Sequence, residues 1–217
     1  QDVSIVDSKF KNIIDLGSKG LSHAVYLSNV KKAEINDNLL ENDSLYTYTK
    51  NGSGGLQTQS GNNTKVSIKR NKFFNTNSNL NNGVEFELKS NVFINSSLNF
   101  KDLDNLEMVD NKFYSTVDHL EILGLIKLRD NVTNAKVEEN IFEKSSNFSN
   151  TSTALQLYGD CSNIDILNNS FNNFGFSILL GNIGSDQTIN NTKINNNRFN
   201  INGRPSFYYY MGSLSFI

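Results

Sequence analysis

Two glutamates, Glu85 and Glu87, are the residues whose type and spacing best suit chemistry on a substrate. They stand two apart in the run GVEFELKSN, where apolar residues alternate as in a strand with one buried face. In such a strand both carboxylates share the outer face, with their Cα atoms about 6.5–7 Å apart. That separation is near the lower end for the acid and base of an inverting glycosidase. Arg129 is the third catalytic candidate, because its guanidinium could contact the carboxylate of an acidic sugar.

A second set of side chains has the composition expected of a sugar-binding surface. Each lies at an outward position of one of the short runs AVYL, GLQTQS, LIKLR and LQLY. Tyrosine rings can cover the apolar faces of pyranoses, while glutamine, lysine and arginine bind hydroxyl and carboxylate groups. The predicted substrate-binding residues are Tyr26, Gln57, Gln59, Lys127, Gln156 and Tyr158. An ordinary solvated strand face is the alternative interpretation of the same residues.

These candidates are distributed over a repeat that occupies almost the whole chain. Its phrase is apolar-x-apolar-x-x-Asn-x-apolar, as in VSIKRNKF at 66–73 and LEMVDNKF at 106–113. Successive copies lie 20 to 33 residues apart, which is within the range of solenoids and propellers. The asparagine position of the phrase is occupied by Ser8, Asn38, Asn71, Asn91, Asn111, Asn140, Asn169 and Asn197.

The repeated asparagine predicts a ladder of side-chain amides. The alternating apolar residues make each phrase a strand, and the asparagine lies at the bend that follows it. With strands stacked at about 4.8 Å, each amide can donate to one neighbour and accept from the other. We expect the asparagine itself to take the left-handed backbone conformation at this bend. The aromatic residues of the phrase are expected to stack in a column: Phe73, Phe93, Phe113, Phe142, Phe171 and Phe199.

Three short strands per repeat, an asparagine at a tight bend and variable inserts resemble the right-handed parallel β-helix of the pectate-lyase-like superfamily. The resemblance is one of fold and covers residues 3–212. It implies an all-β, single-stranded parallel β-helix solenoid of about eight coils, each with three short strands and a place in the asparagine ladder. The leucine-rich repeat has a similar phrase, but the spacings here are uneven and the polar inserts are too short for helices.

The resemblance also implies what a catalytic member would contain. Members similar to polygalacturonases use clustered carboxylates, but their aspartate motifs are absent from this sequence. Lyase members hold Ca²⁺ with acidic residues and use an arginine or lysine as base; Arg129 and Lys127 could supply that cation, but no aspartate triplet accompanies them. No cofactor is firmly predicted, although Glu87 and Glu107, which are neighbours in successive copies, could share a Ca²⁺ ion. With two histidines and one cysteine in the chain, no zinc cluster is predicted.

Composition restricts the remaining functional classes. A net charge of -2 with both signs interleaved argues against a nucleic-acid partner, which would need a basic stripe. No apolar run approaches the roughly 18 residues of a membrane span. The repeat continues without a break, so residues 1–217 are expected to form one domain. Because solenoids need capped ends and this chain opens directly on a repeat, we expect it to be part of a longer chain.

Two functions are consistent with these observations. The first is an extracellular polysaccharide-recognising protein, secreted or at the cell surface, which would be a polysaccharide lyase or glycoside hydrolase if it is an enzyme. The second is a non-catalytic adhesion or structural shaft, such as a surface adhesin segment or a phage tailspike-like rod on a virion, for which a homotrimer is expected. Turnover on a panel of glycans would favour the first, and a trimer in solution would favour the second.

Overall fold

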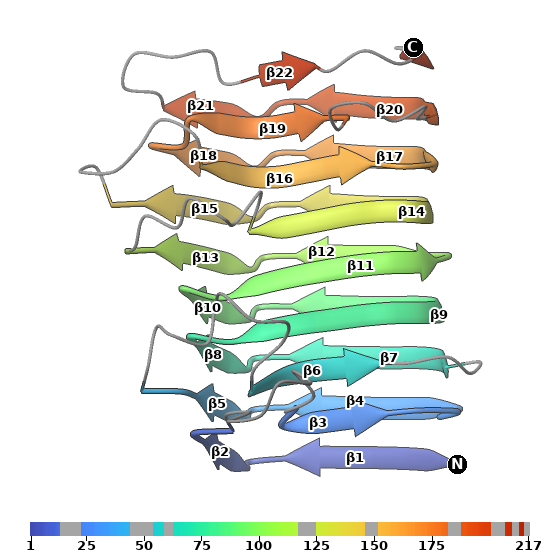
Figure 1. The fold of residues 1–217 in the computed structure, drawn as a ribbon, viewed down its shortest axis with the longest axis vertical. Coiled ribbons are helices and arrows are strands. Elements are labelled where there is room, and N and C mark those ends of the chain that lie inside the picture. The colour runs from blue at the N-terminus through green and yellow to red at the C-terminus, as the bar shows by residue number, and fades with distance from the viewer. Residues whose placement is uncertain are drawn as a thin grey trace, which may run out of the picture.

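The computed structural model describes residues 1–13, 23–43, 54–58, 63–116, 125–145, 152–181, 188–200, 207–209 and 213–214. In this part of the chain every regular element is a β-strand, so the all-β prediction is confirmed. All of the strand pairs are parallel, and the strands stack along the long axis of the molecule (Figure 1). Within these ranges no helix has the length and apolar character needed to cross a membrane.

The first strand group carries most of the predicted sugar-binding residues. Its strands lie at the front of Figure 1 and pair with one another in sequence order. They are β3 (Val25–Leu27), β6 (Gly54–Thr58), the first part of β9 (Asn77–Lys89), β11 (Ser97–Leu103), the first part of β14 (Ile126–Glu138), β16 (Thr153–Tyr158), β19 (Phe176–Leu180) and β22 (Phe207–Tyr209).

The second strand group contains the apolar half of the repeated phrase. Because β9 and β14 run on from the first group, the two groups form one 15-stranded sheet among the described residues. We call the turn between them the first bend. Besides the second parts of β9 and β14, the group contains β1 (Asp2–Val6), β4 (Lys32–Asn36), β7 (Asn63–Lys69), β12 (Leu106–Val109), β17 (Cys161–Leu167), β20 (Thr188–Asn195) and β23 (Ser213–Leu214).

The third strand group follows the ladder asparagine and forms a separate eight-stranded sheet among the described residues. We call the turn between the second and third groups the second bend. The strands of the third group are β2 (Lys9–Lys11), β5 (Leu39–Glu41), β8 (Lys72–Phe74), β10 (Val92–Ile94), β13 (Lys112–Ser115), β15 (Ile141–Lys144), β18 (Ser170–Asn172) and β21 (Arg198–Asn200).

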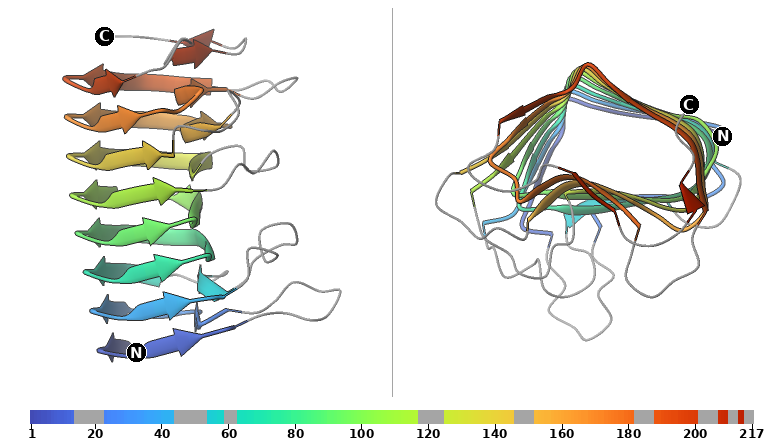
Figure 2. Two further views of the ribbon diagram at one scale, coloured as in Figure 1. Left: turned by 90° about the vertical axis from the view of Figure 1, so that its left-hand side faces the viewer. Right: turned by 90° about the horizontal axis from the view of Figure 1, so that it is seen from above.

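The three strand groups surround one interior (Figure 2), and buried apolar side chains of the described residues fill it. Inward side chains alternate with outward ones; Phe86 and Leu88, for example, are buried, whereas the alternating Glu85 and Glu87 point outward. The predicted phenylalanine column is confirmed: from Phe73 to Phe199 adjacent rings are stacked, with centroids 4.6, 4.7, 4.9, 4.7 and 5.3 Å apart. Stacked parallel sheets around one interior are compatible with a parallel β-helix.

The predicted asparagine ladder is present at the second bend. At Asn111, which is fully buried, the backbone N and Nδ2 both donate to Oδ1 of Asn140, at 2.9 and 3.0 Å. Its Nδ2 also donates to the carbonyl oxygens of Leu88 and Val109, at 2.9 and 3.1 Å. Its own Oδ1 accepts from the backbone N and Nδ2 of Asn91, at 3.0 and 2.9 Å. The ladder therefore supplies the hydrogen bonds that buried polar groups require.

The expectation about backbone conformation at this bend was wrong. The residue before each ladder asparagine, and not the asparagine, takes the positive φ, which is 55° at Asp110 and 57° at Glu139. The other residues in this position with positive φ are Asp7, Asp37, Arg70, Ser90, Asn168 and Asn196. Asparagine occupies the ladder position because its amide is both donor and acceptor, and not because it tolerates a left-handed backbone.

Candidate functional site

Outward side chains of the first strand group form two columns across neighbouring strands. Four of the predicted binding residues belong to the first of them, which we call the polar column. Its Cα atoms pair in the order Tyr26, Gln57, Asn79, Asn99, Lys127 and Gln156. Gln59 lies outside the described residues. The strand register therefore aligns in one column side chains that are up to 130 positions apart in the sequence, from Tyr26 to Gln156.

The charged column runs beside the polar column and contains the other two predicted residues of this face, Arg129 and Tyr158. Its order across the strands is Asn81, Lys101, Arg129 and Tyr158. Asp130, at the first bend, lies 3.6 Å from Lys101 and 3.8 Å from Arg129, measured from its Oδ2 to the cationic nitrogens. These partly exposed ion pairs are long, so they add little stability and leave both cations able to contact a ligand.

A hydrogen-bonded chain joins the two columns. Nε of Arg129 donates to Oδ1 of Asn99 at 2.8 Å, and Nδ2 of Asn99 donates to Oδ1 of Asn79 at 3.0 Å. The guanidinium and the two amides are partly exposed, and each is fixed by its neighbour. Such preorganisation lowers the entropy lost when a flexible polymer binds.

Lys127 is the cation of this face that lacks a counter-charge. Its side chain is partly buried, and within the described part of the chain its ammonium takes part in no hydrogen bond or ion pair. The pKa of Lys127 is lowered mainly by burial and, to a smaller extent, by the nearby positive charge of Arg129. Both effects disfavour the charged ammonium, so an anionic ligand group at this place would stabilise it.

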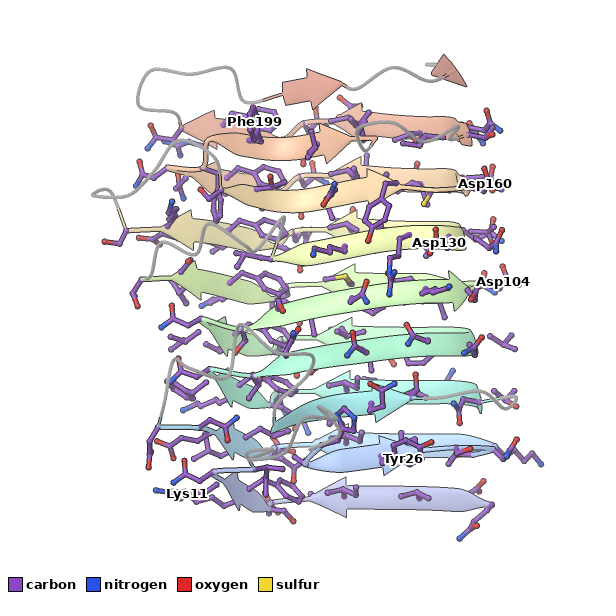
Figure 3. All side chains as sticks on the ribbon, viewed as in Figure 1. Lys11, Tyr26, Asp104, Asp130, Asp160 and Phe199 are labelled. Atoms are coloured by element: carbon purple, nitrogen blue, oxygen red, sulfur yellow. The ribbon has the colours of Figure 1, made fainter. Side chains whose placement is uncertain are left out.

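The two ends of the polar column differ in exposure. Tyr26 on β3 is 53% exposed, and its ring centroid lies 6.4 Å from that of His23 at an angle of 31°; Figure 3 shows this end of the column. Gln156 on β16 is only 2% exposed, and its Nε2 donates to the carbonyl of Gly181 at 3.3 Å. A ligand on this face can therefore reach the side chain of Tyr26, whereas that of Gln156 is covered.

The structure does not bring Glu85 and Glu87 together with Arg129. Both glutamates belong to the second part of β9 and pair with β7 and β12, whereas Arg129 lies in the first strand group, on a different side of the molecule (Figure 2). Glu85 forms an ion pair with Lys65, and Oε2 of Glu87 lies 2.8 Å from Nζ of Lys69.

A pocket of about 460 Å³ lies over β9, β12 and β14 and is lined by Glu85, Glu87, Glu107 and Lys136 among others. Glu87 and Glu107 are direct neighbours in the register, as expected for a shared Ca²⁺ ion. Calcium takes about six to eight oxygen ligands, but the described residues contain no group of three or more His, Cys, Asp or Glu side chains that could hold a metal ion. The calcium bridge remains a prediction.

Cys161 has the environment of a core residue. It is 1% exposed, and its Sγ lies 3.6 Å from the carbonyl oxygen of Leu128 and 3.5 Å from that of Tyr158. Burial is the largest cause that raises the pKa of this thiol, to about 12. A thiol that stays protonated at neutral pH is a poor nucleophile, so Cys161 fills space in the interior.

The sequence analysis missed a second amide ladder, which lies at the first bend. Nδ2 of Asn191 donates to Asn163 at 2.7 Å, Nδ2 of Asn163 to Asn134 at 3.0 Å, and Nδ2 of Asn134 to Asp104 at 2.8 Å. Figure 3 shows Asp104 at this edge of the stack, with Asp130 and Asp160 above it. The available signal was an asparagine directly before the phrase in four consecutive copies: Asn105, Asn134, Asn163 and Asn191.

Comparison of the chain with protein-family models, curated proteins and solved structures found no match. What the two columns can do therefore follows from their own chemistry. They combine an exposed aromatic ring, oriented amides and cations in excess of nearby carboxylates. Such a surface can bind hydroxyl groups and anions.

Proposed function

We propose that this chain is a right-handed parallel β-helix of about eight coils that binds an extended acidic polysaccharide along the outer face of its first strand group. The observation that carries the proposal is the in-register polar column, with the exposed Tyr26 toward one end and Lys127 toward the other, where Arg129 lies in the neighbouring charged column. The geometry supports binding without cleavage, and an extracellular location is proposed because long polysaccharides are found there.

The spacing of the column suits a linear polymer. Strands repeat at about 4.8 Å, so the column offers one polar group per strand to a chain lying along the stack. The amides of Gln57, Asn79 and Asn99 are each partly exposed and can both donate to and accept from sugar hydroxyls. Repetition of one modest contact is how an extended binding surface reaches useful affinity.

The charge of the face favours an acidic polymer over a neutral one. Lys101, Lys127 and Arg129 outnumber the carboxylates of Asp102 and Asp130, whose ion pairs are with Lys101 and Arg129. A carboxylate or sulfate on the sugar would supply the counter-charge for Lys127, and an arginine can bind such a group with two parallel hydrogen bonds. Glu85 and Glu87 belong to another strand group, so cleavage is not part of this proposal.

The structural shaft is the second candidate function, and the continuous interior supports it. The buried amide ladder and the stacked phenylalanines run through consecutive strands without a missing member from Asn71 to Asn197 and from Phe73 to Phe199. A stiff rod of this kind could present a distal binding part, as in a tailspike-like trimer. Light scattering that finds a stable trimer and a glycan panel that finds no ligand would together favour the shaft.

The test of polysaccharide binding uses a matched pair of lysine substitutions. The purified chain is applied to immobilised polygalacturonate, alginate, hyaluronan, dextran sulfate and the neutral polymer dextran. We expect retention on one or more of the acidic polymers, and a loss of about tenfold or more in affinity for Lys127→Met. Lys193→Met makes the same charge change on the exposed outer face of β20 and should bind like the parent chain.

Three results would count against the proposal. They are retention on none of the acidic polymers, equal retention on dextran, and equal losses for Lys127→Met and Lys193→Met. Release of reducing or unsaturated ends that disappears in the double variant Glu85→Gln, Glu87→Gln would instead support the catalytic prediction.

A further inference from the structure

The face of the first strand group is divided into a neutral half and a cationic half. On β3, β6 and the first part of β9, the described outward side chains are Tyr26, Gln57, Asn77, Asn79 and Asn81. Charge begins at Lys101 on β11 and continues with Lys127 and Arg129 on β14. A ligand that uses the whole face therefore meets uncharged groups first and cations afterwards.

The cationic half has a defined end. Beyond Lys127 the polar column continues with Gln156 and Leu179, which are 2% and 5% exposed. Their burial closes the polar column at β16 and β19, although both positions point outward in the register. The open part of the column thus extends from Tyr26 on β3 to Lys127 on β14.

The distance between the two ends exceeds the length of one sugar. The register passes from Tyr26 to Gln57, Asn79, Asn99 and Lys127, which is four strand-to-strand steps, or about 19 Å. A pyranose has roughly the length of one such step, so about four or five linked units are needed to touch both ends. A short acidic oligosaccharide can satisfy the cations but cannot also reach the tyrosine.

From this arrangement we infer that the face selects glycans by length and by charge position: a neutral sugar ring stacks on Tyr26, and an acidic group four strands away contacts Lys127 and Arg129. The inference rests on the proposed function, because it describes how the same surface chooses its ligand. The lowered pKa of the uncompensated Lys127 agrees with an anion being required at that end. A polymer that contains both neutral and acidic sugars can satisfy both ends, whereas one that is acidic at every unit cannot place a neutral ring on Tyr26.

The test measures how affinity depends on oligosaccharide length. Hyaluronan fragments of two, four, six and eight sugars, which alternate acidic and neutral units, are titrated calorimetrically beside polygalacturonate fragments of the same lengths and dextran sulfate. For the hyaluronan series we expect a rise of about tenfold or more between two and six sugars, with little gain at eight. The affinity of the polygalacturonate series should rise less with length, because any unit of this polymer that stacks on Tyr26 is charged. Comparison of dextran sulfate with the two carboxylate polymers identifies the preferred anion.

Two substitutions assign the length dependence to the two ends. Tyr26→Ala should lower the affinity for the six-sugar fragment about tenfold and leave the two-sugar fragment unchanged. Lys127→Met should weaken both fragments. Tyr114→Ala on β13, in the third strand group, is the matched control and should bind like the parent chain, with circular dichroism confirming that each variant is folded.

The outcomes separate this inference from the proposed function. If fragments of two sugars bind as tightly as fragments of six, or if Tyr26→Ala weakens all lengths equally, the two-ended selection is wrong while polysaccharide binding stands. If none of these fragments and none of the immobilised acidic polymers binds, both fail. A preference for polygalacturonate over hyaluronan at equal length would overturn the assignment of a neutral sugar to Tyr26.

Discussion

The two bends of the repeat place asparagine on opposite sides of the backbone. At the second bend the ladder amides are inside, and Asn111 and Asn140 are fully buried. At the first bend the ladder amides of Asn134 and Asn163 are exposed. The interior of the first bend is filled instead by an apolar column of Leu103, Val132, Cys161 and Ile189.

The same residue type is therefore used for two different physical reasons. At the second bend the backbone strain falls on the preceding residue, and asparagine is needed to satisfy buried donors and acceptors. At the first bend Asn134, Asn163 and Asn191 themselves take positive φ, of 52°, 56° and 49°, and their amides could bind water equally well. Hydrogen bonding should therefore dominate the contribution of the buried ladder to the free energy of unfolding. Backbone conformation should dominate the contribution of the exposed ladder.

The largest effect is expected when the buried ladder is broken. Asn111→Ala removes the acceptor used by Asn91 and the donor used by Leu88, Val109 and Asn140. Several buried groups then lack partners, so the free energy of unfolding should fall by about 3–5 kcal/mol. Urea unfolding followed by circular dichroism measures the loss.

The control for this substitution is Asn195→Ala, because the side chain of Asn195 is exposed. It should change the free energy of unfolding by about 0.5 kcal/mol or less. If Asn111→Ala costs no more than this control, water must enter the interior and replace the amide, and the buried ladder would be no stronger than the exposed one.

The buried ladder and the phenylalanine column could be predicted because a short local phrase carries both. The first-bend ladder depends on one residue before that phrase, so no periodic pattern of apolar residues indicates it. The candidate site was less predictable. The pattern of GVEFELK in β9 indicates one continuous strand, but the positive φ at Asn82 turns the chain just before it. Glu85 therefore lies on a different face from Arg129. Burial of Gln156 likewise depends on contacts distant in sequence.

The apolar interior of the first bend can be tested through the titration of Cys161. Cys161→Ala should lower the free energy of unfolding by about 1–2 kcal/mol at pH 8, because it leaves a small cavity. The folded-state pKa of the thiol is raised to about 12 from its ordinary value of 9.0. Below pH 9 the thiol is protonated in both states, so its contribution is fully present. Above pH 9 the unfolded chain ionises first, and this contribution is lost as pH rises toward the folded-state pKa.

Alanine at this position does not titrate. The difference in free energy of unfolding between the parent and Cys161→Ala should therefore shrink above pH 9 and vanish at about pH 10. Urea unfolding of both proteins between pH 8 and pH 10.5 measures it, and the other titrating groups cancel in the difference. A difference that stays constant over this range would mean that the folded thiol ionises as readily as the unfolded one. The interior of the first bend would then be open to water.

The smallest effect is expected at the exposed ladder, where two substitutions separate its hydrogen bonds from its backbone conformation. Both Asn163→Ala and Asn163→Gly remove the amide that bonds to Asn134 and Asn191. Only alanine is strained at a φ of 56°, so Asn163→Ala should cost about 1 kcal/mol, and Asn163→Gly should be within about 0.5 kcal/mol of the parent chain. The shift of the urea midpoint measures both. Equal losses for the two variants would show that the exposed amides stabilise the fold through their hydrogen bonds, which would make the two bends alike in energy despite their difference in burial.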